Sequence, residues 1–516
     1  MRFVLTMLMV FAVSSCEKDS HTLETSKTLP NIIFILADDL GYGDPSCMNA
    51  SGKIMTPELD KMAKCGMLFT DAHSNSAVCT PTRYGVVTGR YAWRSRLKKG
   101  VLGGDSKHLI DPNRITVADI LKKKGYHTAM IGKWHLGWDF KKDKEKIKVK
   151  NKTKIVRKID FTANVTNGPD VLGFDYYYGH CGSLDMGPYV YVENGKITSL
   201  PNRVTKNTGK KMWRLGDTAE DFVHIDVLPN FVNRGCEYIK QRAKTGKPFF
   251  LYLPLPSPHT PILPIEKFQG KSGTNEYGDF VQQVDWHVGQ IISTLKQAGV
   301  YDNTLVIFTS DNGCSGSANF AELKNFGHNP SERYRGRKTD IYEGGHRVPY
   351  LVQWPKEVTG GQVSNATVCL TDLAATVAEI VGEKIPDNAA EDSISIMSAL
   401  RNERPLRKDI IHHSINGLFA IKRGDWKLIF CPGSGGRGAF PSPGRDSMEG
   451  LPPIQLYNLK NDPSEKNNVY SKHPEIVEKL TALITEDVVN GRSTPGAKQK
   501  NDGGNYWPQL TWMKKP

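Results

Sequence analysis

Four short and nearly continuous apolar segments are spaced along the chain. They lie at residues 31–36, 126–132, 248–255 and 304–310. Segments of this kind are typical of strands buried on both faces of a parallel sheet. Amphipathic segments predict helices at residues 57–67, 116–124, 230–245 and 279–298. The alternation predicts an α/β fold with helices on both faces of a mostly parallel sheet.

The pattern changes toward the C-terminus. Residues 416–430 predict a hairpin of two strands around Arg423-Gly424-Asp425, and 455–459 a further short strand. Residues 473–490 have a helical pattern, whereas 432–450 are rich in Gly, Pro and Ser and predict a loop. We therefore expect a large domain over 31–390 and a small α+β subdomain over 391–516.

The N-terminus has the features of a targeting segment. Arg2 precedes an apolar segment at 3–13 that is too short to span a bilayer. Val13-Ser14-Ser15-Cys16 resembles a bacterial lipobox, with Cys16 as the lipidated residue. We expect a signal peptide over 1–16, a flexible polar tether over 17–30, and an exported lipoprotein in the periplasm or at the cell surface. Plain secretion is the alternative.

Charge and cysteine content narrow the choice of partner. The 68 basic and 54 acidic residues give a net charge of +14, which attracts polyanions. Export argues against nucleic acid and leaves a sulfated polysaccharide, or a basic surface that is merely solvated. The densest basic run, 141–158, predicts an exposed loop or hairpin. The nine cysteines have no C-x-x-C pair, so a zinc site is not expected, and one or two disulfides can form.

Polar groups follow each predicted strand directly. In chain order they are Asp38 and Asp39, Lys133 and His135, His259, and Asp311 and Asn312. Because the carboxyl ends of parallel strands meet at one edge of a sheet, the four strand ends predict one polar pocket. The carboxylate and amide oxygens suit Ca²⁺ or Mg²⁺, although either pair alone would be read as turn residues.

The segment 76–90, SAVCTPTRYGVVTGR, carries the most specific signal. Pro81 suits the first turn of a helix and places Cys79 at its N-terminus, where backbone amides favour negative charge. With Arg83 nearby, this describes an activated cysteine. A thiol protease fits that description, but it would have no use for the carboxylate cluster.

The segment resembles the sulfatase signature, in which C-x-P-S-R is followed several residues later by T-G-R. The resemblance extends over about 30–500 through further motifs in family order: Ala37-Asp38-Asp39-Leu40-Gly41-Tyr42-Gly43-Asp44, Gly132-Lys133-Trp134-His135-Leu136-Gly137, Ser310-Asp311-Asn312-Gly313, Gly336-Arg337-Lys338, Glu343-Gly344-Gly345-His346-Arg347-Val348-Pro349 and Leu456-Tyr457-Asn458-Leu459. The chain is similar to type I sulfatases such as arylsulfatase A and N-acetylgalactosamine-6-sulfatase.

This resemblance implies an alkaline-phosphatase-like fold, with a large mixed sheet flanked by helices, and hydrolysis of sulfate esters. In the family a formylglycine-generating enzyme oxidises the signature cysteine, here Cys79, to formylglycine. One calcium ion is implied, held by Asp38, Asp39, residue 79, Asp311 and Asn312. The implied catalytic and substrate-binding residues are Cys79, Arg83, Lys133, His135, His259 and Lys338.

The implied roles follow the chemistry of sulfate. Hydrated formylglycine attacks sulfur while Lys133 and Lys338 bind the sulfate oxygens, which stabilises developing charge. His259 protonates the leaving alcohol. His135 takes a proton from the remaining hydroxyl, which expels sulfate. Arg83 steadies residue 79 and the metal site.

Two positions depart from the family pattern or vary within it. Thr82 stands where the signature has serine, which puts recognition by the maturation enzyme in doubt. His346 fills a variable position and is either a substrate contact or a packing residue. A phosphonate or phosphodiester hydrolase of the same superfamily, and a non-catalytic glycan-binding protein, remain as rival interpretations.

The sequence does not identify the sulfated sugar. Algal polymers such as ulvan or carrageenan and host glycosaminoglycans all fit an exported sulfatase. Specificity is expected in loops at 141–170, 179–215, 314–335 and 432–450, because loops carry most binding residues. The candidate sugar contacts in them are His180, Asp185, Arg333 and Arg335.

Overall fold

The computed structural model describes residues 28–149, 152–404, 407–439, 442, 444 and 446–513. The predicted signal peptide, Cys16 and nearly all of the predicted tether lie outside the described residues. Within the described part of the chain, no helix is long and apolar enough to cross a membrane.

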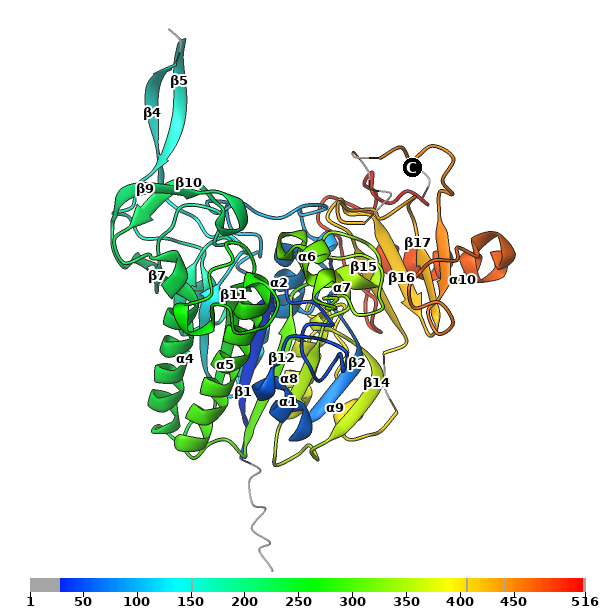
Figure 1. Cartoon of the computed structure of the whole chain (residues 1–516), viewed down its shortest axis with the longest axis horizontal. Helices are drawn as coiled ribbons and strands as arrows, with labels where there is room; N and C mark the ends of the chain where they lie inside the picture. Colours follow the sequence, from blue (N-terminus) through cyan, green and yellow to red (C-terminus); the bar gives the residue numbers. More distant parts are fainter. Residues whose placement is uncertain are drawn as a thin grey trace, which may run out of the picture.

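A ten-stranded mixed sheet forms the centre of the molecule (Figure 1), in the order β14-β2-β13-β12-β1-β11-β3-β6-β7-β8. Five neighbouring strands, β12, β1, β11, β3 and β6, run parallel. The strands are β1 Asn31–Asp38, β2 Met67–His73, β3 His127–Lys133, β6 Tyr176–His180, β7 Val192–Glu193, β8 Lys196–Ile197, β11 Phe249–Pro258, β12 Thr304–Ser310, β13 Tyr350–Gln353 and β14 Gln362–Cys369.

The four apolar segments form the middle of this sheet, as predicted. All of β11 and β12 is buried, and β1 and β3 are buried except at their first residues. The expectation of a mostly parallel sheet is too simple, because β13 and the β6-β7-β8 edge are antiparallel. The mixed sheet expected for an alkaline-phosphatase-like fold is confirmed.

Helices cover both faces of the sheet, as the amphipathic segments predict. In one group, α5 contacts both α1 and α4. The other group contains α2, α3 and α8, which contact one another. Their bounds are α1 Pro57–Lys64, α2 Cys79–Thr88, α3 Val117–Lys122, α4 Val227–Ala243, α5 Glu276–Gln297 and α8 Leu373–Val381. Three shorter helices are α6 Phe320–Asn325, α7 Glu343–His346 and α9 Met397–Leu400.

A second, four-stranded antiparallel sheet stands beside the first at the C-terminal end of the chain (Figure 1). It contains β15 Asp409–His413, β16 Phe419–Arg423, β17 Trp426–Ile429 and β18 Gln455–Asn458, and α10 Pro474–Asn490 packs on it. The predicted hairpin is β16–β17, which turns at Gly424 and Asp425. This sheet has its own apolar cluster, centred on Phe419, Leu428 and Ile484.

Two hairpins extend from the main sheet on the β6–β8 side (Figure 1). The basic run forms the longer one, β4 Lys142–Val149 paired with β5 Lys152–Ile159. The other pairs β9 Pro201–Asn207 with β10 Trp213–Ala219. Both lie at the end of the molecule where the parallel strands finish, and the β4–β5 hairpin projects away from the rest of the molecule.

Candidate active site

The carboxylates predicted from two separate strand ends meet in the structure. Asp38 ends β1, Asp39 follows it, and Asp311 follows β12; all three are fully buried. Ligand oxygens of the three carboxylates lie within 4.8 Å of one another. Asn312 Nδ2 donates to Asp39 Oδ1 over 2.7 Å, which brings the fourth predicted ligand into the same cluster.

This cluster fits a hard divalent cation. Asp38 Oδ1 and Asn312 Oδ1 are buried and have no hydrogen-bond partner among the described residues. Burial raises the pKa of Asp311 to about 7, and the Asp38 carboxylate adds to the rise. Crowded carboxylates with unpaired oxygens are what a bound Ca²⁺ neutralises. The predicted donor set is therefore compatible with calcium.

Arg83 links the carboxylates to the neighbouring strand end. Its Nε and Nη2 atoms donate to Asp311 Oδ2 over 3.0 and 2.7 Å, and its Nη1 donates to the Lys133 carbonyl over 3.0 Å. The guanidinium is fully buried. Arg83 thus orients Asp311 by a charge-assisted pair, which is stronger than a neutral hydrogen bond.

The helix start predicted at Cys79 is present. Helix α2 begins at Cys79, and Pro81 lies in its first turn. The thiol Sγ, an Asp38 oxygen and a His259 ring nitrogen lie within 4.8 Å of one another. Burial raises the pKa of the Cys79 thiol, although Lys133 and Lys338 partly oppose the rise. The expected activated thiolate is therefore wrong for the unmodified residue, and the thiol-protease interpretation loses its physical basis.

Thr82, in the first turns of α2, is bonded to the segment that precedes the helix. Its hydroxyl donates to the Ser76 carbonyl over 3.1 Å, and the side chain is fully buried. Thr82 therefore makes the same hydrogen bond in the folded protein that a serine would make.

Two lysines face the carboxylates, Lys133 fully buried and Lys338 with its side chain 14% exposed. Lys133 Nζ contacts Asp38 Oδ2, and Lys338 Nζ lies 2.7 Å from Asp39 Oδ1. Although burial alone would raise it, Lys133 and the other nearby cations hold the pKa of Asp38 well below its ordinary value. Two fixed ammonium groups beside Cys79 form an environment for an anion.

The two predicted histidines occupy different sides of the cluster. His259 Nε2 lies 3.6 Å from Asp39 Oδ2, and burial lowers the pKa of His259, with Lys338 adding to the effect. His135 Nε2 contacts the Leu102 carbonyl at 2.9 Å, which leaves its buried Nδ1 without a described partner. Burial, aided by Lys133, holds the pKa of His135 well below its ordinary value. Both rings can therefore accept a proton.

Two of the site residues have unusual backbone conformations. Asp39 has φ 65° and His135 has φ 53°, both in the left-handed region that residues other than glycine rarely adopt. Such conformations persist where the surrounding structure enforces them, and they concentrate at functional sites.

Ser183 belongs to the site but was not found from the sequence. It follows β6, and its hydroxyl lies 3.2 Å from Lys133 Nζ and 3.3 Å from His259 Nδ1. A signal was present, because Tyr176–His180 is a fifth strand and Ser183 lies three residues beyond its end. Its aromatic composition, YYYGH, hid it from a search for aliphatic segments.

His346 lies away from this cluster, in a buried chain of hydrogen bonds. Lys427 Nζ lies 2.9 Å from His346 Nε2, the Nδ1 atoms of His346 and His73 are 3.2 Å apart, and His73 Nε2 lies 2.9 Å from Asp71. If Lys427 donates, each ring nitrogen has one defined role. The rings of His346 and His412 stack at 3.7 Å and 14°, so their planes cannot both point at one ion. His346 is therefore a packing residue, and this histidine cluster is not arranged to bind a metal.

Two of the four candidate sugar contacts lie in the segment that carries Ser183, and the other two lie elsewhere. His180, paired in register with Lys133, and Asp185 are buried in the segment that carries Ser183. Arg333 stacks on Tyr334, and Arg335 lies over Tyr342, which packs against the C-terminal sheet.

All eight described cysteines are free thiols, so the disulfides allowed by the sequence do not form among them.

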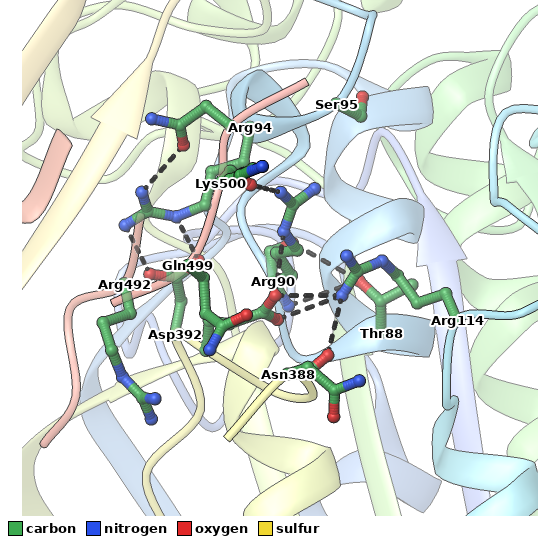
Figure 2. Close-up of polar contacts among 12 residues, drawn as sticks. Thr88, Arg90, Arg94, Ser95, Arg114, Asn388, Asp392, Arg492, Gln499 and Lys500 are labelled. Carbon is green, nitrogen blue, oxygen red and sulfur yellow. Dashed lines mark hydrogen bonds and ion pairs between the residues drawn. The ribbon is translucent and has the colours of Figure 1, made fainter. Parts of the chain in front are cut away.

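The Thr88-Gly89-Arg90 part of the signature has a structural role (Figure 2). Arg90 Nε lies 3.2 Å from Glu391, and its Nη2 donates to the Lys500 carbonyl over 2.9 Å. Close by, Arg94 makes two hydrogen bonds of 2.8 Å to Asp392. The end of α2 is thereby tied to the C-terminal part of the chain.

Comparisons with known proteins identify the family of the chain. A family model described as Sulfatase matches residues 30–383. An N-acetylgalactosamine-6-O-sulfatase of Bacteroides thetaiotaomicron is 35% identical over 88% of this chain and 92% of its own. Human arylsulfatase A is 28% identical over 88% and 87%. A solved Bacteroides thetaiotaomicron sulfatase, from work on glycosaminoglycan metabolism, superposes with a TM-score of 0.76 at 33% identity, covering 89% of this chain and 98% of that one.

The lysines and the candidate divalent-cation site at the start of α2 suit an anionic substrate. The chain belongs to the sulfatase family, whose formylglycine-dependent type I members include these relatives. It is an enzyme that hydrolyses sulfate esters.

Proposed function

We propose that residue 79, converted to formylglycine, is the nucleophile of this sulfatase and that Asp38, Asp39, Asp311 and Asn312 hold one calcium ion beside it. The observation that carries the proposal is the burial of Cys79 among three carboxylates and two lysines. The hydrated aldehyde supplies an oxygen nucleophile, and calcium supplies a positive charge next to the sulfate oxygens.

The side chains of the site divide the remaining work. Lys133, Lys338 and Ser183 bind the sulfate oxygens, since the two lysines act electrostatically on Cys79 and the Ser183 hydroxyl lies 3.2 Å from Lys133 Nζ. His259, which its lowered pKa leaves neutral in the absence of substrate, takes up a proton as the sulfate anion binds and passes it to the leaving alcohol, and its position against Ser183 and Asp39 is suitable for this. His135 accepts a proton at Nδ1, the buried atom without a described partner.

We propose a 6-O-sulfated galactosamine unit of a glycosaminoglycan-type chain as the substrate. The support is the 35% identity to an N-acetylgalactosamine-6-O-sulfatase over nearly the full length of both proteins. The net charge of +14 favours a polyanionic substrate of this kind. Algal polymers such as ulvan and carrageenan are the competing substrate class.

The experiment is sulfate release by enzyme that has been co-expressed with a formylglycine-generating enzyme. Chondroitin-6-sulfate oligosaccharides, carrageenan and ulvan oligosaccharides and a phosphodiester are supplied in parallel, with Cys79→Ala as the control. We expect release from the first substrate only, and none from the control. Cleavage of the phosphodiester alone would instead support the phosphodiesterase interpretation. No turnover of any substrate, with formylglycine confirmed by mass, would mean that the panel lacks the right glycan or that the site is used only for binding.

We also propose that Cys16 is lipidated and anchors the exported enzyme to a membrane, on the support of the lipobox-like Val13-Ser14-Ser15-Cys16. Cells that express the full chain should retain the enzyme in the membrane fraction, whereas Cys16→Ala should release it. Equal membrane retention of both proteins would contradict a lipid anchor at Cys16.

A further inference from the structure

The wall of the active site beside His259 is formed partly by the β9–β10 hairpin. The hairpin is fixed there by its turn, where the Lys210 carbonyl accepts hydrogen bonds from the Thr260 hydroxyl at 3.2 Å and the Ile262 N–H at 3.3 Å. Thr260 directly follows His259, the proposed acid for the leaving alcohol. The sugar part of the substrate therefore lies toward this hairpin.

A second segment, the loop after β6, meets the hairpin at the same wall. The backbone N–H of Arg214 donates to the Asp185 carbonyl over 3.1 Å, and the Tyr189 hydroxyl donates to the Arg214 carbonyl over 2.7 Å. Arg214 Nη2 lies 3.2 Å from Asp185 Oδ2. These contacts fix Asp185 and Arg214 together, two residues along the chain from Ser183.

The two halves of this ion pair are unequal. The Asp185 side chain is 6% exposed, and its Oδ1 has no hydrogen-bond partner among the described residues. The Arg214 side chain is 57% exposed, so its remaining N–H groups face solvent. A buried carboxylate oxygen without a donor lowers stability, and a purely structural arginine pair commonly uses both oxygens. The unpaired Asp185 Oδ1 and the solvent-facing N–H groups of Arg214 are therefore the atoms of this pair left for a ligand.

We propose that Asp185 and Arg214 bind the sugar ring that carries the sulfate ester, an inference that rests on the proposed function. A pair of neighbouring ring hydroxyls matches them, because one hydroxyl can donate to Asp185 Oδ1 while the other accepts from Arg214. Neither side chain touches the bond that breaks. They orient the ring so that its sulfate reaches residue 79, and they determine which sugar is accepted.

The test compares a sulfated sugar with a sulfate ester that lacks ring hydroxyls. For Asp185→Asn and Arg214→Gln we expect kcat/KM for galactosamine-6-sulfate to fall about 10- to 100-fold, the usual effect of an unmatched buried polar contact. Turnover of 4-nitrophenyl sulfate should change less than about 3-fold. Lys206→Gln removes an exposed charge from the same hairpin and should leave both substrates unaffected.

Deoxy sugar substrates give a second measurement, because they remove the ring hydroxyl without changing the wild-type protein. If Asp185 binds a ring hydroxyl, the 3-deoxy or 4-deoxy substrate is poor for the wild type but no poorer for Asp185→Asn, so the two losses do not add. Equal losses on sugar and aryl substrates, or fully additive losses with both deoxy sugars, would overturn the inference. A wild-type enzyme that is inactive on every sulfate ester would contradict the proposed function itself, and with it this subsite.

Discussion

Three buried polar atoms of the active site have no hydrogen-bond partner among the described residues: Asp38 Oδ1, His135 Nδ1 and Asn312 Oδ1. Lys133 and Lys338 instead pair with the carboxylates that we assign to calcium. A cation held by these carboxylates would compete with both lysines for the oxygens and would leave the lysine ammonium groups available to the sulfate. At the scale of single residues, the site is therefore arranged for a metal and an anion together.

Ser183 provides a test at this scale. Its hydroxyl contacts Lys133 and His259, so Ser183→Ala should lower kcat/KM for every sulfate ester by about 10-fold or more, because a hydrogen bond to a charged group is lost. Ser293→Ala, an exposed serine on α5, is the matched control. Unchanged kinetics in Ser183→Ala would show that the hydroxyl does not contact substrate or acid during turnover.

At the scale of elements, the loop after β1 is held by one buried carboxylate. Asp44 accepts hydrogen bonds from the Gly41 N–H at 2.6 Å and from the Tyr277 hydroxyl, and it lies 2.9 Å from His328 Nε2. The Lys53 N–H donates to His328 Nδ1, which leaves the proton on Nε2 to face Asp44. This loop keeps Asp39 in its left-handed conformation and aims its carboxylate into the site.

Asp44→Asn should therefore weaken calcium binding by about 10-fold or more without removing a proposed ligand, because ligands held by outer hydrogen bonds lose affinity when those bonds are lost. Calorimetric titration of calcium into the metal-free enzyme measures this independently of turnover. Asp111→Asn, at an exposed position, should bind calcium as the wild type does. Equal calcium affinities for the wild type and Asp44→Asn would contradict a role of Asp44 in positioning Asp39.

At the scale of the whole molecule, the nucleophile turn is held by the C-terminal sheet. The His413 carbonyl of β15 accepts from the Ala77 N–H at 3.0 Å, and His412 Nδ1 lies 3.2 Å from the Ser74 carbonyl. His73 and His346 complete a buried histidine group between the two sheets. The C-terminal part of the chain is thus needed to position Cys79.

This histidine group makes stability depend on pH. Burial lowers the pKa of His413 to about 4, from an ordinary value near 6.5. The folded state therefore binds fewer protons than the unfolded state between these values, and stability falls as pH decreases from about 6.5 to 4. The effect of His413 alone is on the order of 3 kcal/mol. The raised pKa of Asp487, about 8 through burial, acts in the opposite direction.

Thermal unfolding between pH 7.5 and 4.5 should show a falling Tm for the wild type and a shallower fall for His413→Gln. His473→Gln, a partly exposed histidine, is the control and should follow the wild type. Because Asp487 and other buried acids are the same in every variant, their effect on the pH dependence of Tm cancels when the variants are compared. A wild-type slope that His413→Gln leaves unchanged would contradict the assignment.

The sequence predicts most of the site because Asp38, Lys133, His259 and Asp311 each lie at the end of a locally recognisable buried strand. Proximity then follows from the parallel sheet. Ser183 was missed because its strand is aromatic. The partners of His346 could not be found, because His73 and Lys427 are distant in sequence and meet it only when the two sheets pack. Strand β13 has only 4 residues, too few to show a pattern.

The most direct test of the account is the dependence of sulfate release on the fraction of residue 79 that is formylglycine. Preparations co-expressed with increasing amounts of the formylglycine-generating enzyme give a range of fractions, each measured by mass spectrometry of the peptide that contains Cys79. The account predicts a rate on 6-sulfated galactosamine oligosaccharide that is proportional to this fraction and reaches zero at zero conversion. A substantial rate in fully unconverted enzyme would contradict it.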